Sequence, residues 1–271
     1  MNSDGSLSPL LGTPFPAGNG PVSVVTHPNA DFLYVSNQGS GELMVFVIDP
    51  ELTSSSSVMI GNAPLFGAIT SDGARFYQTI SSLAQIAGFS VSATDGSLTP
   101  IGGSPFSTGF FPRTIAIDPA GKFLYATISS SSMGTSTSIY GYTIDAASGG
   151  LTAMPGSPFP TGENPASAAV DVSGRFLFVA NNANTANGNS VSAFSINPDT
   201  GVLTAVPGSP FPASPFPLSV ATDPSGKYVY VGLDSSPGIA AFVMNQSTGA
   251  LTPVAGSPFP GSTVWSIATT Y

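Results

Sequence analysis

The sequence predicts an all-β fold, a β-propeller of four-stranded antiparallel blades, on three observations. The tetrapeptide Gly-Ser-Pro-Phe begins at positions 103, 156, 208 and 256, and a variant, Gly-Thr-Pro-Phe, begins at position 12. A repeat of about 50 residues with strand-like content is typical of propeller blades. Between the copies, apolar and polar residues alternate and are punctuated by turn residues, as in strands rather than helices. We therefore predict a single propeller domain.

The repeats divide the chain into five complete blades with incomplete segments at both ends. Residues 1–20 resemble a fourth strand alone, and residues 263–271 resemble a closing first strand alone. A split or incomplete sixth blade is expected from them, so the chain has the pattern of a fragment of a six- or seven-bladed ring. Imperfect closure and self-association through unpaired edges are the alternatives, because an open sheet edge accepts another strand. The predicted blades are residues 21–63, 64–111, 112–164, 165–216 and 217–262.

Each unit contains four strand-like segments in the same order. The first is rich in small residues, as in 114–117, because equivalent strands crowd around the propeller axis. A tight turn such as 119–122 leads to an alternating apolar second strand, as in 123–126. The third carries an aromatic residue at one register, for example Tyr142 or Phe194, which should pack between neighbouring blades.

The fourth strand, as in 203–206, runs directly into the tetrapeptide. Glycine adopts positive φ without strain, and proline has no N–H to donate to a sheet. We therefore expect the tetrapeptide to leave the edge strand and to begin the crossing to the next blade. Phe211 and its equivalents should then fill the gap between blades. In the first blade the tetrapeptide is eroded to Gly61-Asn62-Ala63-Pro64.

Composition excludes several classes of partner. Charged residues are only 7% of the chain, and the net charge of −9 would repel the phosphates of nucleic acid. No apolar run is long enough to predict a membrane span. Cysteine is absent, and no metal-ligand spacing, phosphate-binding loop or cofactor motif is found. Abundant Ser, Thr, Gly, Asn and Pro with few lysines favour an extracellular, periplasmic or cell-surface protein, although residues 1–5 do not begin a signal peptide.

Candidate binding residues lie where the repeats differ. The position just before the first strand holds Arg113 in one unit and Trp265 near the C-terminus, so it could form a rim at the mouth of the channel. Arg113 could bind a carboxylate or pair with a neighbouring acid. Trp265 could stack on a ring or sugar, or close the last blade. The other residues assigned to this position are Val22, Phe66, Ala166 and Leu218.

Other polar residues are interpreted as structural. His27, the single histidine, lies in the turn after a first strand, where other units have Asp118, Asp171 and Asp223. General acid–base catalysis would need it to face a pocket, so we interpret these four as turn residues. An asparagine-rich insert follows the second strand of one unit, and we expect an extended hairpin or a contact surface there, since calcium would need carboxylates. Its asparagines are Asn181, Asn182, Asn184, Asn187 and Asn189.

Several of these segments resemble the lactonase-type and YVTN-type β-propeller superfamily. They are the Phe-Leu-Tyr-Val strand at 32–35, the Tyr-Val-Tyr-Val strand at 228–231, the Asp-Pro-x-Gly-Lys turns, and the Thr-Gly-x-Leu-Thr segments at 200–204 and 248–252. The resemblance covers nearly the whole chain. It implies a seven-bladed fold that, in members similar to 6-phosphogluconolactonase and the carboxymuconate cyclases, binds small acids in the central channel. Many YVTN-type members are instead surface proteins.

The enzyme branch of that superfamily is characterised by Pro-Arg-His at a first strand and a Glu after a second strand. Pro112-Arg113 matches two positions, but Thr114 occupies the third, and only Asp234 is acidic after a second strand. We therefore favour a binding scaffold for a small acid, a glycan or a protein, with Arg113, Trp265, Phe66, Asp234 and Asn181 as binding residues. The alternatives are a lactonase-like hydrolase or cyclase using Arg113, and a self-assembling structural module.

Overall fold

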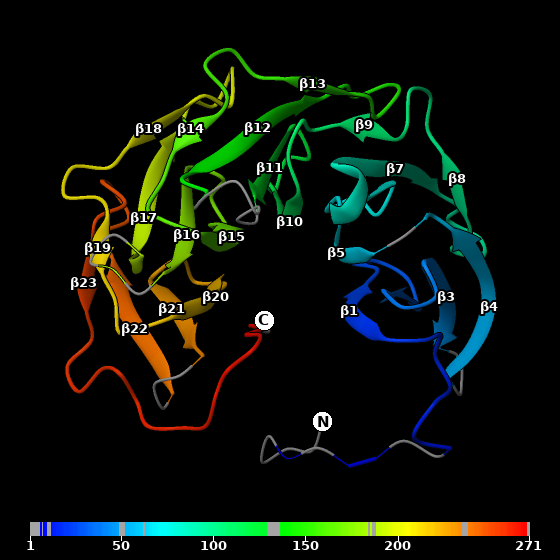
Figure 1. The fold of residues 1–271 in the computed structure, drawn as a ribbon, viewed down its shortest axis with the longest axis horizontal. Helices are drawn as coiled ribbons and strands as arrows, with labels where there is room; N and C mark the ends of the chain where they lie inside the picture. Colours follow the sequence, from blue (N-terminus) through cyan, green and yellow to red (C-terminus); the bar gives the residue numbers. More distant parts are fainter. Residues whose placement is uncertain are drawn as a thin grey trace.

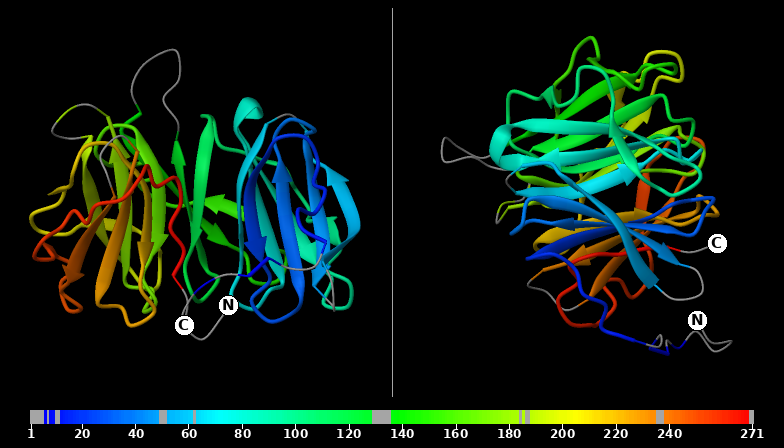
Figure 2. Two further views of the ribbon diagram at one scale, coloured as in Figure 1. Left: turned by 90° about the horizontal axis from the view of Figure 1, so that it is seen from below. Right: turned by 90° about the vertical axis from the view of Figure 1, so that its right-hand side faces the viewer.

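The structure is a computed structural model, and it describes residues 6, 8–9, 12–48, 52–61, 63–128, 136–183, 185, 188–234 and 238–269. In these ranges the strands form five antiparallel sheets. The sheets stand around a common axis as the blades of an incomplete propeller (Figure 1), and the side views in Figure 2 show their strands running along that axis. The predicted all-β propeller class is confirmed.

Each blade starts with its inner strand and proceeds outward in chain order. A short 3-10 helix, η1 (Ser81–Leu83), lies in blade 2. Blade 1 comprises β1 (Pro21–Thr26), β2 (Phe32–Asn37), β3 (Glu42–Ile48) and β4 (Leu52–Met59), and blade 2 comprises β5 (Pro64–Ile69), β6 (Arg75–Ile80), β7 (Gln85–Val91), β8 (Leu98–Pro100) and β9 (Phe106–Ser107). Blade 3 comprises β10 (Pro112–Ile117), β11 (Phe123–Ile128), β12 (Ser138–Ile144), β13 (Leu151–Ala153) and β14 (Phe159–Pro160), and blade 4 comprises β15 (Pro165–Val170), β16 (Phe176–Asn182), β17 (Asn189–Ile196), β18 (Leu203–Ala205) and β19 (Phe211–Pro212). Blade 5 comprises β20 (Pro217–Thr222), β21 (Tyr228–Leu233), β22 (Ile239–Met244) and β23 (Leu251–Pro253).

The two terminal segments differ from the expected strands. Within 1–20 the described residues form no strand, and neither do residues 263–269. A strand needs a continuous ladder of backbone hydrogen bonds, and these segments make only scattered ones. Gln38 N donates to Gly20 O at 2.8 Å, and Val264 N donates to Leu233 O at 3.0 Å. The C-terminal segment therefore runs along blade 5 toward the axis without extending its sheet (Figure 1).

The tetrapeptide forms a turn within a blade, which corrects the expectation that it leaves the edge strand. In blade 3, the third strand, β12, pairs with β13 and also with the tetrapeptide, where Phe159 lies opposite Ile139. The serine holds the turn in place, because Gly141 N donates to Ser157 Oγ at 3.0 Å. Serines 104, 209 and 257 accept the equivalent backbone N–H in blades 2, 4 and 5. The tetrapeptide glycines do adopt positive φ, as predicted.

The core consists of four apolar clusters, each between two adjacent blades. The third-strand aromatics Phe89, Tyr142, Phe194 and Phe242 are buried in these clusters, as predicted. Phe159 of the tetrapeptide is 6% exposed between blades 3 and 4. Its equivalent in blade 5, Phe259, is 43% exposed. The tetrapeptide phenylalanine is therefore an inter-blade residue that depends on a following blade for its burial.

Second-strand tyrosines add hydrogen bonds across three of the blade junctions. Each hydroxyl donates to a glycine carbonyl in the outer turn of the next blade: Tyr34 to Gly96 at 3.1 Å, and Tyr77 to Gly149 and Tyr125 to Gly201 at 2.7 Å. A buried hydroxyl needs such a partner to offset the loss of its hydration. Burial raises the pKa of Tyr34 and of Tyr77 to about 12.

These raised pKa values predict alkaline destabilisation. The unfolded value is near 10.0, so the tyrosine contribution to stability is complete below that pH and is lost as the pH rises to about 12. We expect the free energy of unfolding, measured with urea, to fall steeply between about pH 10 and about pH 12. Tyr77→Phe should show a smaller fall over the same range. A fall of equal size in both proteins would contradict the assignment.

Candidate functional site

Each inner strand begins with a proline followed by an irregularity in its pairing. In β10, Pro112 pairs with Ile128 and regular pairing resumes at Ile115, so the residue after the proline lies in a bulge. The other four inner strands show the same shift after their first proline. Bulges redirect side chains at the ends of sheets. The position at which the repeats differ is therefore a set of bulge residues around one end of the axis.

The pairing corrects one of the predicted rim residues. In blade 2, Pro64 pairs with Ile80, and regular pairing resumes at Gly67. Leu65 therefore takes the place of Arg113, and Phe66 takes the place of Thr114. Their hydrogen bonds agree with this alignment, because Phe66 N donates to Thr79 Oγ1 just as Thr114 N donates to Thr127 Oγ1. The bulges of blades 1 and 2 each hold one extra residue. The equivalence follows from the turn after the inner strand, because Thr70 N donates to Arg75 O as Asp118 N donates to Phe123 O, so Pro64 corresponds to Pro112.

Arg113 is held firmly by its main chain while its side chain stays available. Its carbonyl accepts a hydrogen bond from Thr79 Oγ1 of the preceding blade at 3.0 Å. The neighbouring Thr114 hydroxyl lies 2.8 Å from that of Thr127. The guanidinium is half-buried, and within the described ranges no hydrogen bond or ion pair joins it to another residue. Arg113 is also the one charged residue among the bulge positions, since Val22, Leu65, Ala166 and Leu218 are apolar.

Asp234 supplies negative charge to the same end of the axis. It follows β21, whose last residue, Leu233, pairs with the first residue of β20. Its backbone N donates to Phe216 O at 3.0 Å, and its carbonyl accepts from Thr263 Oγ1 at 2.6 Å. Burial lowers the pKa of the Arg113 guanidinium, and the charge of Asp234 opposes that shift. The structure thus brings together two of the predicted residues, which lie two blades apart in the chain.

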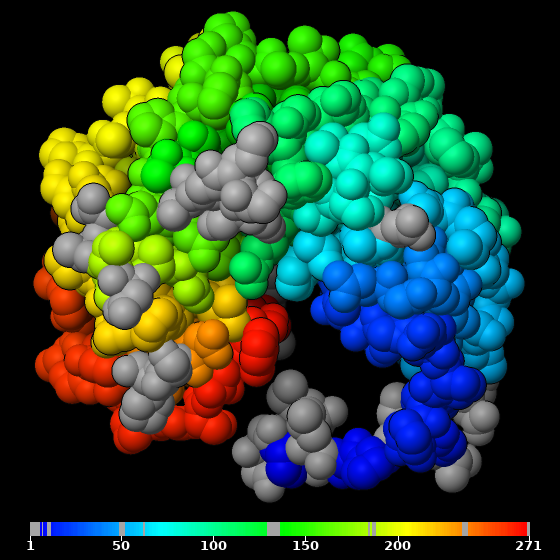
Figure 3. All heavy atoms as spheres, in the orientation of Figure 1, coloured from blue at the N-terminus to red at the C-terminus, as the bar shows by residue number. Residues whose placement is uncertain are grey.

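Trp265 lies on the segment that is fixed to this part of blade 5. Its neighbour Val264 is bonded to Leu233, and Thr263 is bonded to Asp234. The indole itself is 71% exposed, so it does not pack as a blade-closing residue. Figure 3 shows the central opening of the ring continuing outward between blade 1 and the C-terminal segment that carries this residue. Trp265 is therefore an exposed side chain on the segment that borders this opening.

Asn181 does not join this group. It is fully buried, and its Nδ2 donates to Ser190 Oγ and Ser192 Oγ, both at 3.0 Å. Its Oδ1 has no partner in the described part of the chain. These bonds hold it between β16 and β17, so its role is to connect those strands rather than to contact a ligand at the rim. Asn184 and Asn187 of the same insert lie outside the described residues.

The turn residues are structural, as predicted. His27 Nδ1 accepts from Asn29 N at 3.1 Å, so its Nε2 donates to Gly73 O of the next blade, at 3.2 Å. The Asp118 carboxylate accepts three backbone N–H groups of its own turn, from Ala120, Lys122 and Phe123. Asp171 and Asp223 repeat the arrangement. These turns lie at the opposite end of the inner strands from Arg113, so His27 is not part of the site.

An aromatic pair next to the site was not predicted. Phe110 and Phe111 directly precede Pro112 and are exposed, by 51% and 40%. The Phe110 ring lies 5.7 Å from that of Tyr140 of the same blade. The signal was available, because the equivalent connection before blade 4 carries Glu163 and Asn164. Blade 3 thus combines exposed aromatic side chains with the charged bulge residue.

Two further observations concern all the described residues. They hold no cluster of three or more His, Cys, Asp or Glu side chains arranged to bind a metal ion. Among them there is also no helix with the length and apolar character needed to span a bilayer.

Comparison with known proteins shows the fold and the family. A family model described as "Lactonase, 7-bladed beta-propeller" matches residues 3–163 and 153–266. A proposed 6-phosphogluconolactonase from Bacteroides uniformis has a similar structure, with a TM-score of 0.76, 19% identity, and coverage of 91% of this chain and 72% of the other. A second, from Bacteroides fragilis, has a TM-score of 0.74, 20% identity, and coverage of 92% and 72%. The periplasmic gluconolactonase of Pseudomonas aeruginosa has a TM-score of 0.54, 19% identity, and coverage of 86% and 84%. A search of curated proteins found no match.

Proposed function

Because the chain belongs to the lactonase family of seven-bladed β-propellers, we propose that it is a hydrolase of a small acidic lactone, with Arg113 as the residue that binds the acid group. The observation that carries this proposal is the half-buried Arg113 guanidinium at the channel end of β10. It has no hydrogen-bond partner in the described ranges. A guanidinium whose N–H groups make no hydrogen bond to the described residues can donate them to an anion, and paired N–H donors match a carboxylate or a phosphate.

Asp234 is the proposed general base. Its charge acts on Arg113, and its backbone is fixed by Phe216 and Thr263. In hydrolysis, the water oxygen bonds to the lactone carbonyl carbon and gives its proton to the carboxylate of Asp234. The bond between that carbon and the ring oxygen then breaks, and the ring oxygen takes the proton to become a hydroxyl. The product hydroxy acid ionises, so each turnover releases one proton to the solution.

The second candidate is binding of an acidic ligand without turnover. It is favoured by Thr114, which occupies the third position of the Pro-Arg-His signature and whose hydroxyl lies 2.8 Å from that of Thr127. His27 lies at the other end of the inner strand and cannot substitute. Exposed Trp265 and Phe110 would suit a ring-shaped or sugar-like ligand in either case.

A lactone panel separates the two candidates. Purified protein is assayed with 6-phosphogluconolactone, gluconolactone and an uncharged γ-lactone, and proton release above the spontaneous rate is recorded. Hydrolysis requires turnover of the anionic lactone, and Asp234→Asn should then reduce kcat about 100-fold or more, as is typical of a lost general base. Binding of 6-phosphogluconate by calorimetry with no turnover of any lactone would favour the scaffold. If the protein neither turns over a lactone nor binds 6-phosphogluconate, both candidate functions are excluded.

A further inference from the structure

Blade 1 lacks the phenylalanine that the other blades place between themselves and the next blade. In blades 2, 3 and 4 this residue pairs with one position of the third strand: Phe106 with Ile86, Phe159 with Ile139, and Phe211 with Val191. The equivalent third-strand residue of blade 1 is Leu43, which is paired with Ser36 as Ile86 is with Thr79. Leu43 pairs with Val58 of β4. Val58 therefore occupies the position of the phenylalanine.

The outer strand of blade 1 also differs from those of the other blades, because no tetrapeptide turn interrupts it. Where the tetrapeptide would turn, β4 continues as one strand with a single extra residue, Ser55, whose Oγ donates to Val45 O at 3.3 Å. The chain therefore reaches the phenylalanine position without a turn but with a smaller side chain. A valine fills less of this space than a phenylalanine does, and Val45, at the position of Gly88 and Gly141, takes up part of the remainder.

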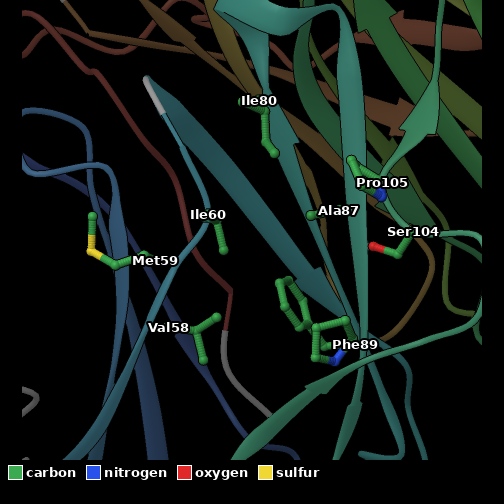
Figure 4. Close-up of a pocket in the computed structure, with 9 residues that line it drawn as sticks. Val58, Met59, Ile60, Ile80, Ala87, Phe89, Ser104 and Pro105 are labelled. Atoms are coloured by element: carbon green, nitrogen blue, oxygen red, sulfur yellow. The ribbon is translucent and has the colours of Figure 1, made fainter.

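A pocket of about 180 Å³ lies at this place, between blades 1 and 2. Figure 4 shows Val58 and Ile60 on one side of it and Ile80, Ala87 and Phe89 on the other. The last three are almost fully buried. The polar side chain in the lining, Ser104, already accepts a hydrogen bond from Gly88 N at 2.9 Å. The pocket thus offers apolar surface and little to bind a charge.

The volume of the pocket and its apolar lining indicate the size and polarity of a ligand that fits it. An apolar cavity of about 150 Å³ lined by aliphatic and aromatic side chains stays dry and binds benzene. The chain itself fills the equivalent space at the next junctions with a phenylalanine ring. We propose that the pocket between blades 1 and 2 binds a small uncharged compound with a single aromatic ring, which takes the place of the missing phenylalanine. This site is separate from the Arg113 site and does not depend on the proposed function.

Fluorobenzene observed by ¹⁹F NMR tests the proposal on the full chain. We expect saturable binding to the wild-type protein and at least tenfold weaker binding to Val58→Phe, in which the new ring fills the pocket. Val172→Phe, at an exposed valine of blade 4, is the matched control and should bind as the wild type does. The fluorobenzoate anion, with the same ring and a charge, should bind at least tenfold more weakly than fluorobenzene.

A second variant provides the same test if Val58→Phe does not fold. Ala87→Leu enlarges a lining residue from the side of blade 2 and should also abolish binding. The proposal is overturned if the wild-type protein shows no saturable binding. It is equally overturned if the folded filled-pocket variants, judged by their circular dichroism, bind fluorobenzene as well as the wild type does.

Discussion

Replacing Arg113 with methionine is expected to lower kcat/KM for 6-phosphogluconolactone about 10- to 100-fold, because one charge-assisted hydrogen-bonded contact is worth about 1.5–3 kcal/mol. The thermal midpoint should change little, since the guanidinium makes no hydrogen bond within the described ranges. The main-chain bond from Thr79 to the carbonyl of this residue is retained in the variant. Steady-state proton release and a thermal melt measure the two quantities.

Arg175→Met is the matched control for this experiment. Arg175 lies in the turn at the other end of an inner strand, where its guanidinium donates to Gln246 O. Its replacement removes the same charge and leaves the Arg113 site intact. If both variants lose activity equally, a general effect of net charge explains the loss and the anchoring role of Arg113 is wrong.

Replacing Phe159 with alanine is expected to lower the free energy of unfolding by about 3–5 kcal/mol, the usual effect of emptying a buried aromatic site. The ring is almost fully buried between blades 3 and 4, against Tyr125 and Met154 among others. Urea denaturation followed by circular dichroism measures the change. This is the largest stability effect expected from a single tetrapeptide residue.

The equivalent residue of blade 5 supplies the control. Phe259 occupies the same place in its tetrapeptide but is 43% exposed, so Phe259→Ala should cost less than about 1 kcal/mol. Similar losses in the two variants would show that the phenylalanine acts within its own blade. The inter-blade role of the tetrapeptide would then be wrong.

The repeat pattern was sufficient to predict the blades, because every unit carries the same alternation and the same turns. Backbone register was not predictable from it. Register counted from Pro64 places Leu65 rather than Phe66 at the rim position, and a shift of one residue in a strand changes the face on which a side chain lies. The turn geometry of the tetrapeptide was also missed, since it depends on the bond between Ser157 and Gly141, which are distant in sequence.

The site was predictable where the repeats disagree in charge. Arg113 and Asp234 stand out from their equivalents by composition alone, but their mutual influence requires the ring to bring blades 3 and 5 to one axis. Asn181 was wrongly assigned to the rim, because nothing in a polar insert distinguishes a buried amide from an exposed one. The pocket beside Val58 was not predictable, because the eroded tetrapeptide was placed at Gly61-Asn62-Ala63-Pro64. In the structure Pro64 begins β5, and Val58 occupies the phenylalanine position.

The most direct test of the Arg113 site is selectivity for charge on the substrate. Proton release is measured side by side with 6-phosphogluconolactone and with gluconolactone, its uncharged counterpart, for the wild-type protein and for Arg113→Met. The wild-type protein should prefer the phosphorylated lactone, and the variant should lose that preference while retaining its rate with gluconolactone. An unchanged preference in the variant, or no turnover of either lactone by the wild-type protein, would contradict the proposed function.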